Sequence, residues 1–218
     1  MKIVLITGVK RGIGEALAKK FLAEGFFVIG TSTDGTSKIK NKNLLVFRMN
    51  LLNPNSIEQC VKKISGLKKK IDIFINNAGT WRPSRKDPKK NMQAFREVMD
   101  INLLGPIDFT ERLLLRLNKG AHIINISSRQ GAFAYPLGTS HKSYKISKAG
   151  LNMYTRALSY ELHGEAIVSS VHPGAVVTDM AANDANMTAE KAAKYIYKLS
   201  ISKPKTGQFW FKGKIFPW

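Results

Sequence analysis

The start of the chain constrains its fold most strongly, because an apolar run leads straight into a glycine-rich turn and then a helical pattern. The run is Lys2 to Thr7 (KIVLIT), rich in the β-branched residues of a buried parallel strand. Three glycines follow within seven residues, at Gly8, Gly12 and Gly14. Apolar residues then repeat at four-residue steps, at Ile13, Leu17 and Phe21. This order of strand, turn and helix favours a dinucleotide site at the turn.

The three glycines have separate physical roles in such a site. Gly8 permits a tight turn, Gly12 lets the backbone approach a pyrophosphate, and Gly14 lets the helix pack closely. The helix N-terminus then offers unpaired N–H groups and a partial positive charge to the phosphates. A glycine-rich turn can also be only a turn, so the strand and helix on either side carry the prediction.

A second feature is the pair Tyr144 and Lys148 in SYKISKAGLN. Residues four apart are neighbours on a helix, and a nearby ammonium favours the phenolate. We therefore expect Lys148 to lower the pKa of Tyr144 and to support proton transfer to a carbonyl or from an alcohol. In isolation, this spacing also fits a tyrosine at the edge of the core and a solvated lysine.

Further motifs are ordered along the chain. They are Asn76-Asn77-Ala78-Gly79 after an apolar run, Asn102 in INLLG, Ser128 in IINISS, and His172-Pro173-Gly174 followed by Thr178. Together with Thr7 to Gly14 and the tyrosine–lysine pair, they resemble the motifs of the short-chain dehydrogenase/reductase family over essentially the whole chain. The short length and the ending Gly207 to Trp218 are most similar to its small carbonyl-reductase branch, which includes sniffer and C-factor proteins.

The resemblance implies four catalytic residues. Tyr144 would exchange a proton with the substrate oxygen, and Ser128 would hydrogen-bond the same oxygen. Lys148 would stabilise the tyrosinate and hold the nicotinamide ribose, while Asn102 would keep a water connected to Lys148. Ser127 is the alternative to Ser128, and Asn102 can instead be a polar residue that kinks its helix.

The predicted cofactor contacts follow the same motifs. They are Gly8, Lys10, Arg11, Gly12, Ile13, Gly14, Ser32, Asn50, Leu51, Asn77, Ala78, Gly79, Tyr144, Lys148, Pro173, Gly174, Val176 and Thr178. Ser32 stands where an acidic residue would favour NAD, and Lys10 and Arg11 can pair with a 2′-phosphate. NADP(H) is therefore preferred and NAD(H) remains possible, since Asp34 can reach the ribose if the strand ends slightly differently.

The periodicities predict a single α/β domain over residues 1–218, a Rossmann-type doubly wound sheet of about seven parallel strands flanked by helices. Strands are expected near 2–7, 27–31, 44–49, 71–75, 121–127, 166–172 and 207–211. Helices are expected near 12–24, 54–65, 91–117, 141–163 and 188–200. The motifs then follow the carboxyl ends of strands, where open parallel sheets bind ligands.

Composition is consistent with a globular domain, since 44% of the 218 residues are hydrophobic. No run approaches the roughly 20 apolar residues of a membrane span, so we expect a cytoplasmic protein without membrane insertion. Cys60 lies on an apolar helical stripe and is expected to be an inert core thiol. The four histidines lack ligand spacing, and no metal site is predicted.

The formal net charge of +20 is high and would attract anionic partners, including phosphorylated or carboxylated metabolites. The lysines are scattered without a nucleic-acid-binding module, so no specific nucleic acid partner is predicted. The leading hypothesis is an NADP(H)-dependent oxidoreductase acting on a small carbonyl or alcohol substrate. The alternative is a nucleotide-binding signalling protein without important turnover. The resemblance also implies a homodimer or homotetramer built on helices 91–117 and 141–163.

The substrate pocket is the least determined part of the sequence. The segment from Arg129 to Ser143 is a little longer than in many relatives. Candidate lining residues are Trp81, Arg82, Phe133, Tyr135 and His141.

Overall fold

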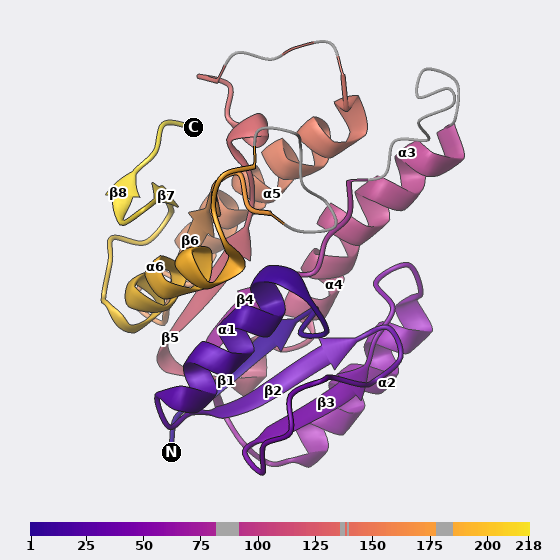
Figure 1. Cartoon of the computed structure of the whole chain (residues 1–218), viewed down its shortest axis with the longest axis vertical. Helices are drawn as coiled ribbons and strands as arrows, with labels where there is room; N and C mark the ends of the chain where they lie inside the picture. Colours follow the sequence, from indigo (N-terminus) through magenta and orange to yellow (C-terminus); the bar gives the residue numbers. More distant parts are fainter. Residues whose placement is uncertain (82–91, 136–137, 139, 178–184) are drawn as a thin grey trace.

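One sheet runs through the whole molecule in the order β3-β2-β1-β4-β5-β6-β7-β8 (Figure 1). The computed structural model describes residues 1–81, 92–135, 138, 140–177 and 185–218. The strands are β1 (Ile3–Thr7), β2 (Phe27–Ser32), β3 (Leu44–Arg48), β4 (Ile71–Asn76), β5 (Leu117–Ile126), β6 (Ala166–Val171), β7 (Gln208–Phe211) and β8 (Lys214–Ile215). The pairings from β3 to β7 are all parallel, which confirms the predicted doubly wound α/β class.

Helices cover both faces of this sheet. They are α1 (Gly12–Ala23), α2 (Pro54–Gly66), α3 (Met92–Met99), α4 (Gly105–Glu111), α5 (Lys142–Glu161) and α6 (Ala189–Ile201), with a π-helix η1 (Asp100–Leu104) and short 3₁₀ turns η2 (Leu114–Arg116) and η3 (Arg129–Gly131). Figure 1 shows α1 and α6 side by side, and the two helices pack on each other.

Two hydrophobic clusters explain why both faces are covered. In β1, Val4 and Ile6 belong to the cluster that includes α1 and α6, whereas Ile3 and Leu5 belong to the cluster that includes α2 and α5. Successive side chains of a strand point to opposite faces, so a continuous apolar strand must be buried on both. Cys60 lies fully buried in the second cluster, and burial raises its pKa to about 12. The expectation of an inert core thiol is therefore confirmed.

The prediction of one long helix over 91–117 is wrong. The chain forms α3, then η1, then α4, and β5 already begins at Leu117 instead of Ala121. The Gly105 N–H donates to the carbonyl of Asp100, five residues earlier, and Pro106 has no N–H to continue the regular ladder. The π-helix therefore forms where the proline removes a donor.

The sequence analysis also did not predict a short eighth strand. β8 pairs antiparallel with β7 across a two-residue turn at Lys212 and Gly213, whose φ angles are +48° and +78°. Positive φ at both central residues is the geometry of the tight hairpin turn that glycine favours. Among the described residues, we find no helix with the length and apolar character needed to cross a membrane.

Candidate functional site

The glycine turn between β1 and α1 is built on close backbone contacts. A Cβ at Gly14 would lie 2.0 Å from the Gly8 carbonyl oxygen and 2.5 Å from Asn77 Nδ2, so only glycine fits there. Gly8 and Gly12 have φ angles of +75° and +59°, which glycine adopts without strain. Each of the three motif positions thus requires glycine, either for lack of space or for a positive φ angle.

Thr7 joins this turn to the end of β4. Its Oγ1 accepts hydrogen bonds from the backbone N–H groups of Asn77 and Ala78, each 2.9 Å long, and Asn77 Nδ2 donates to the Thr7 carbonyl at 2.8 Å. The two motifs therefore form one rigid edge. The sequence analysis missed Thr7 as a site residue, although its position directly before Gly8 was the available signal.

The start of α1 suits an anion. Arg11 is the N-cap residue, and its side chain makes no cap hydrogen bond because a guanidinium has no acceptor. The first N–H groups of the helix therefore lack the usual side-chain cap and face the turn beside Gly12. A dinucleotide pyrophosphate fits this arrangement of glycine backbone and helix N-terminus.

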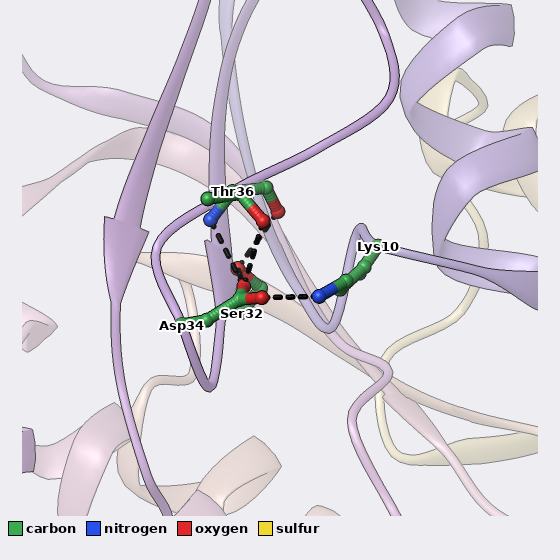
Figure 2. Close-up of polar contacts among 4 residues, drawn as sticks. All are labelled: Lys10, Ser32, Asp34 and Thr36. Carbon is green, nitrogen blue, oxygen red and sulfur yellow. Dashed lines mark hydrogen bonds and ion pairs between the residues drawn. The ribbon is translucent and has the colours of Figure 1, made fainter.

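Figure 2 shows the polar cluster at the end of β2, where the adenosine end of such a dinucleotide would lie. Lys10 forms an ion pair with Asp34, and Asp34 Oδ1 also accepts from the Thr36 N–H at 3.1 Å and from its hydroxyl at 2.9 Å. Ser32 Oγ donates to the Thr36 carbonyl at 2.8 Å. These contacts hold the pKa of Asp34 well below its usual range, Lys10 contributing most. Ser32 and Lys10 thus already have partners within this cluster.

The remaining predicted cofactor contacts lie at the same sheet edge or next to it. Leu51 packs its side chain into the core, which leaves only its backbone for a ligand, and exposed Asn50 accepts from the Leu52 N–H at 3.1 Å. Gly174 has φ +89° and lies against Met187, which pairs with Val176. The predicted contact at Thr178 falls outside the described residues.

Ser128 and Tyr144 meet at the end of β5. The Ser128 side chain lies close enough to the Tyr144 phenol to act on its pKa, and Ser128 Oγ accepts from the Gln130 N–H at 3.2 Å. Ser127 instead donates to the Lys148 carbonyl at 3.2 Å and is buried, so it fixes α5 to the sheet. The geometry therefore places Ser128, and not Ser127, beside the tyrosine hydroxyl.

Lys148 and Asn102 are buried behind this pair. Lys148 Nζ donates to the Ile126 carbonyl at 2.8 Å and lies 5.7 Å from the centroid of the Tyr144 ring. Asn102 forms a reciprocal pair with the Thr80 backbone, with both hydrogen bonds 2.7 Å long, and donates to Ser147 Oγ at 3.2 Å. Asn102 is thus fixed between the motif that follows β4 and the helix that carries Tyr144.

The pKa directions correct one expectation. Burial raises the pKa of Tyr144, and only the hydrogen bond with Ser128 acts in the opposite direction. Lys148 was expected to lower this pKa, but its ammonium is directed to the Ile126 carbonyl. Burial also lowers the pKa of Lys148 to about 8, because a low dielectric disfavours its charged form.

An aromatic wall stands next to Tyr144. Trp81 stacks on His141, with ring centroids 4.2 Å apart, and meets Tyr144 edge to face with centroids 6.3 Å apart. His141 has a left-handed backbone with φ +60°, a costly conformation for a residue with a side chain. Of the other predicted lining residues, Phe133 is 84% exposed and Arg82 lies outside the described residues.

The C-terminal residues hold the segment between Ser128 and Tyr144. The Ala134 N–H donates to the Trp218 carbonyl at 3.0 Å, and the Trp218 ring stacks on buried Phe209 at 5.4 Å. The guanidinium of Arg156 on α5 lies 5.8 Å from the Trp218 ring centroid. Sequence analysis missed this support, because the hydrogen bond from Ala134 to Trp218 joins residues more than 80 positions apart.

Comparisons with known proteins agree with this geometry. Residues 2–189 match the family model described as short chain dehydrogenase. A 3-oxoacyl-[acyl-carrier-protein] reductase FabG of Aquifex aeolicus is 35% identical over 83% of this chain and 76% of its own length. The NADP-dependent 3-hydroxy acid dehydrogenase YdfG of Salmonella typhi is 31% identical over 80% of this chain and 72% of its own.

Solved structures share the fold. A putative short-chain dehydrogenase/reductase from Burkholderia multivorans with bound NADP has a TM-score of 0.89, with 24% identity over 100% of this chain and 99% of its own. The putative carbonyl reductase Sniffer of Caenorhabditis elegans has a TM-score of 0.86, with 23% identity over 100% of both chains.

Proposed function

Because this chain belongs to the short chain dehydrogenase family, we propose that it is an NADP(H)-dependent oxidoreductase acting on a small carbonyl or alcohol substrate. The observation that carries the proposal is the placement of Ser128 beside Tyr144, with the buried ammonium of Lys148 5.7 Å from the tyrosine ring centroid. When bound, the nicotinamide supplies or accepts the hydride.

Tyr144 acts as the general acid in reduction. Its raised pKa keeps the phenol protonated at neutral pH, which is the form that donates to a carbonyl oxygen. Ser128 donates a hydrogen bond to the same oxygen and stabilises the negative charge that develops there. In the oxidative direction, Tyr144 accepts the proton instead, and Ser128 keeps its hydrogen bond to the same oxygen.

Lys148 and Asn102 support the proton transfer. Lys148 lies 5.7 Å from the centroid of the Tyr144 ring, and its lowered pKa of about 8 lets its ammonium exchange protons near neutral pH and so return a proton to Tyr144 after transfer. Asn102 fixes the Thr80 backbone and Ser147 around that ammonium. Its role in connecting a water to Lys148 stays part of the proposal.

Several observations support NADP(H) over NAD(H). Lys10 and Arg11 lie in the glycine turn, and a buried serine stands at residue 32, where an acidic side chain would repel a 2′-phosphate. The name of the YdfG relative specifies NADP. Lys10 already forms an ion pair with Asp34. A 2′-phosphate that binds Lys10 must therefore displace the Asp34 carboxylate from it.

A fluorescence titration with NADPH and NADH, followed by NADPH consumption with a panel of aldehydes, ketones, 3-oxo acids and quinones, tests the proposal. We expect tighter binding of NADPH and turnover of at least one substrate class. Binding without turnover would favour the signalling alternative. Failure to bind either nucleotide would overturn the cofactor site.

The assembly we propose is a homodimer through α5. Three large side chains recur at seven-residue steps along this helix and are 49%, 65% and 71% exposed, namely Ile146, Met153 and Tyr160. An apolar stripe of this kind is typical of a subunit contact. Light scattering is expected to give a dimer or a tetramer for the native chain and a smaller species for Met153→Glu.

A further inference from the structure

Basic side chains stand along the edge of the sheet opposite to the candidate site. The motifs of that site follow the carboxyl ends of strands, whereas these cations precede the amino ends. Lys2, Lys70 and Arg116 directly precede β1, β4 and β5, and Lys42 stands two residues before β3. Parallel strands begin at one edge of a sheet, so the topology gathers these cations there. Figure 1 shows the N-terminus at this edge, below β1 and β2.

Contacts at this edge fix the cations in one row. The Phe27 N–H at the start of β2 donates to the Lys2 carbonyl at 2.9 Å, and Lys69 Nζ lies 5.3 Å from the Phe27 ring centroid. Lys70 Nζ donates to the Leu115 carbonyl at 2.5 Å, which joins the amino ends of β4 and β5. The five strands from β3 to β5 are consecutive neighbours about 4.8 Å apart, so the row spans roughly 20 Å. We call this row the amino edge; its members are Lys2, Lys42, Lys69, Lys70 and Arg116.

Acidic groups do little to neutralise the amino edge. The Asp72 carboxylate accepts hydrogen bonds from the Ile3 N–H at 2.7 Å and from Asn118 Nδ2 at 2.8 Å. Glu24 and Glu165 form ion pairs, at 2.5 and 3.6 Å, with lysines outside the row. In the part of the chain that the structure describes, no ion pair joins an acidic group to a cation of the row. The amino edge therefore presents positive charge to an anionic partner.

Two exposed apolar side chains stand among these cations. Leu115 and Met1 are 87% and 74% exposed, and each directly precedes a cation of the amino edge. Such side chains gain by entering the headgroup region of a bilayer while neighbouring cations meet lipid phosphates. Single-stranded nucleic acid is bound instead through exposed aromatic rings, and the Phe27 ring at this edge is half-buried against Lys69. The combination favours a membrane surface.

We propose that the amino edge binds the surface of a membrane that contains anionic phospholipids. Its lysines and Arg116 meet the lipid phosphates, and Leu115 enters the headgroup region beside them. Attraction between a few cations and such a surface falls off within a Debye length, so the binding is peripheral, reversible and sensitive to salt. The candidate site at the opposite edge of the sheet stays open to solution. The proposal does not depend on the proposed function.

Co-sedimentation with lipid vesicles tests the proposal. We expect the native protein to bind vesicles of equal parts phosphatidylglycerol and phosphatidylcholine, and not vesicles of phosphatidylcholine alone. The triple variant Lys2→Gln, Lys42→Gln, Lys69→Gln is expected to bind the mixed vesicles about tenfold more weakly, because three charges leave the row. Absence of native binding to the mixed vesicles at low salt would overturn the proposal.

A matched triple variant separates the amino edge from the charge of the whole protein, which is +20. Lys142 and Lys191 are exposed in the first turns of α5 and α6, and Lys214 is exposed in β8. Their joint replacement by Gln removes the same charge, and we expect vesicle binding to change by less than about twofold because these sites lie away from the row. Equal weakening in the two triple variants would overturn the proposal.

A fluorescent label tests whether this edge touches the lipid. Cys60 is the one cysteine of the chain and is buried, so Leu115→Cys can be labelled selectively with an environment-sensitive dye. We expect its emission to shift to the blue on the mixed vesicles, whereas the same dye in Lys214→Cys keeps its emission. Equal shifts at both positions, or a shift at neither, would contradict the proposed orientation.

A competition experiment separates the membrane from nucleic acid. We expect single-stranded RNA to bind the native protein more weakly than the mixed vesicles do and to leave the emission of the labelled Leu115→Cys unchanged. Tighter binding of RNA that is lost in the triple variant of the amino edge would assign this edge to nucleic acid and overturn the proposal. These measurements need no cofactor or substrate, so their outcome is independent of whether the protein reduces carbonyls.

Discussion

The two ends of the site are built by different means. At the cofactor end, the backbone N–H groups of Gly8 and Val9 donate to the Thr31 carbonyl, and Gly14 has no room for a side chain. At the substrate end, the segment between Ser128 and Tyr144 is held by side chains and by the carbonyl of Trp218. Backbone contacts tolerate little change, whereas side-chain contacts can vary without disturbing the sheet. We therefore expect substitutions at the substrate end to leave cofactor binding intact.

The largest predicted effect is at the glycine turn. Gly14→Ala would place a Cβ 2.0 Å from the Gly8 carbonyl, so we expect loss of NADPH binding and a decrease of roughly 3 kcal/mol in the free energy of unfolding. A Cβ added at Gly138, at the substrate end, meets none of the described residues within 4 Å, so for Gly138→Ala we expect a change within about 0.5 kcal/mol. Urea unfolding and NADPH titration of both variants check this contrast. Similar losses in the two would remove the distinction between the two ends.

Acid is expected to destabilise the folded protein through His172. Its pKa is about 4 in the folded protein, below the value of about 6.5 in an unfolded chain. The unfolded chain therefore takes up the proton first, and the free energy of unfolding falls as the pH drops from about 6.5 to about 4. The loss is up to about 3 kcal/mol.

Buried His122, with a pKa of about 4, adds a similar loss. The free energy of unfolding, measured between pH 4 and 7, is therefore expected to change less steeply with pH in His172→Asn than in the native protein. If the free energy of unfolding of His172→Asn fell with pH as steeply as that of the native protein, His172 would not be a source of the acid sensitivity.

Trp218→Ala tests the support of the substrate end. The variant loses the stack on Phe209 and the contact with Arg156, so we expect a loss of about 2 kcal/mol in unfolding free energy. The KM for substrate should rise several-fold while the Kd for NADPH stays within about twofold. A matched rise in both constants would show that the two ends are coupled.

The smallest predicted effect concerns the cofactor end. Asp34→Asn frees Lys10 and removes a negative charge near the 2′-phosphate, so we expect NADPH to bind a few-fold more tightly and NADH to bind about equally. Lys10→Gln should weaken NADPH binding by a similar factor. Titrations of both variants with NADPH and NADH, at low and high salt, measure these changes in affinity. If Asp34→Asn changed only NADH binding, the carboxylate would instead act on the ribose.

The sequence predicted the elements whose determinants are local. The glycine spacing and the alternation of strands and helices follow from short motifs and sheet topology, and the placement of Ser128 with Tyr144 follows from the family resemblance. The helix predicted over 91–117 failed because Pro106 interrupts an otherwise periodic pattern. The pKa of Tyr144 was expected to fall because spacing does not show that Lys148 is directed to the Ile126 carbonyl.

The substrate end could not be predicted, because its contacts join distant residues. Neither the hydrogen bond from Ala134 to Trp218 nor a pocket lined by Arg129 and Lys145 leaves a periodic signal in the sequence. The sequence analysis named Trp81, His141 and Tyr135 as residues that line the substrate pocket. In the structure, they lie in two different places. The first two stack beside Tyr144, and the third forms a wall of the pocket lined by Arg129 and Lys145.

The most direct test of the central claim is the rate of carbonyl reduction by Tyr144→Phe with NADPH bound, at the pH where the native protein is fastest. The account predicts a loss of about a thousandfold in kcat with the Kd for NADPH within about twofold, because the variant removes only the proton donor. A rate within tenfold of the native value would contradict the assignment of Tyr144 as the general acid.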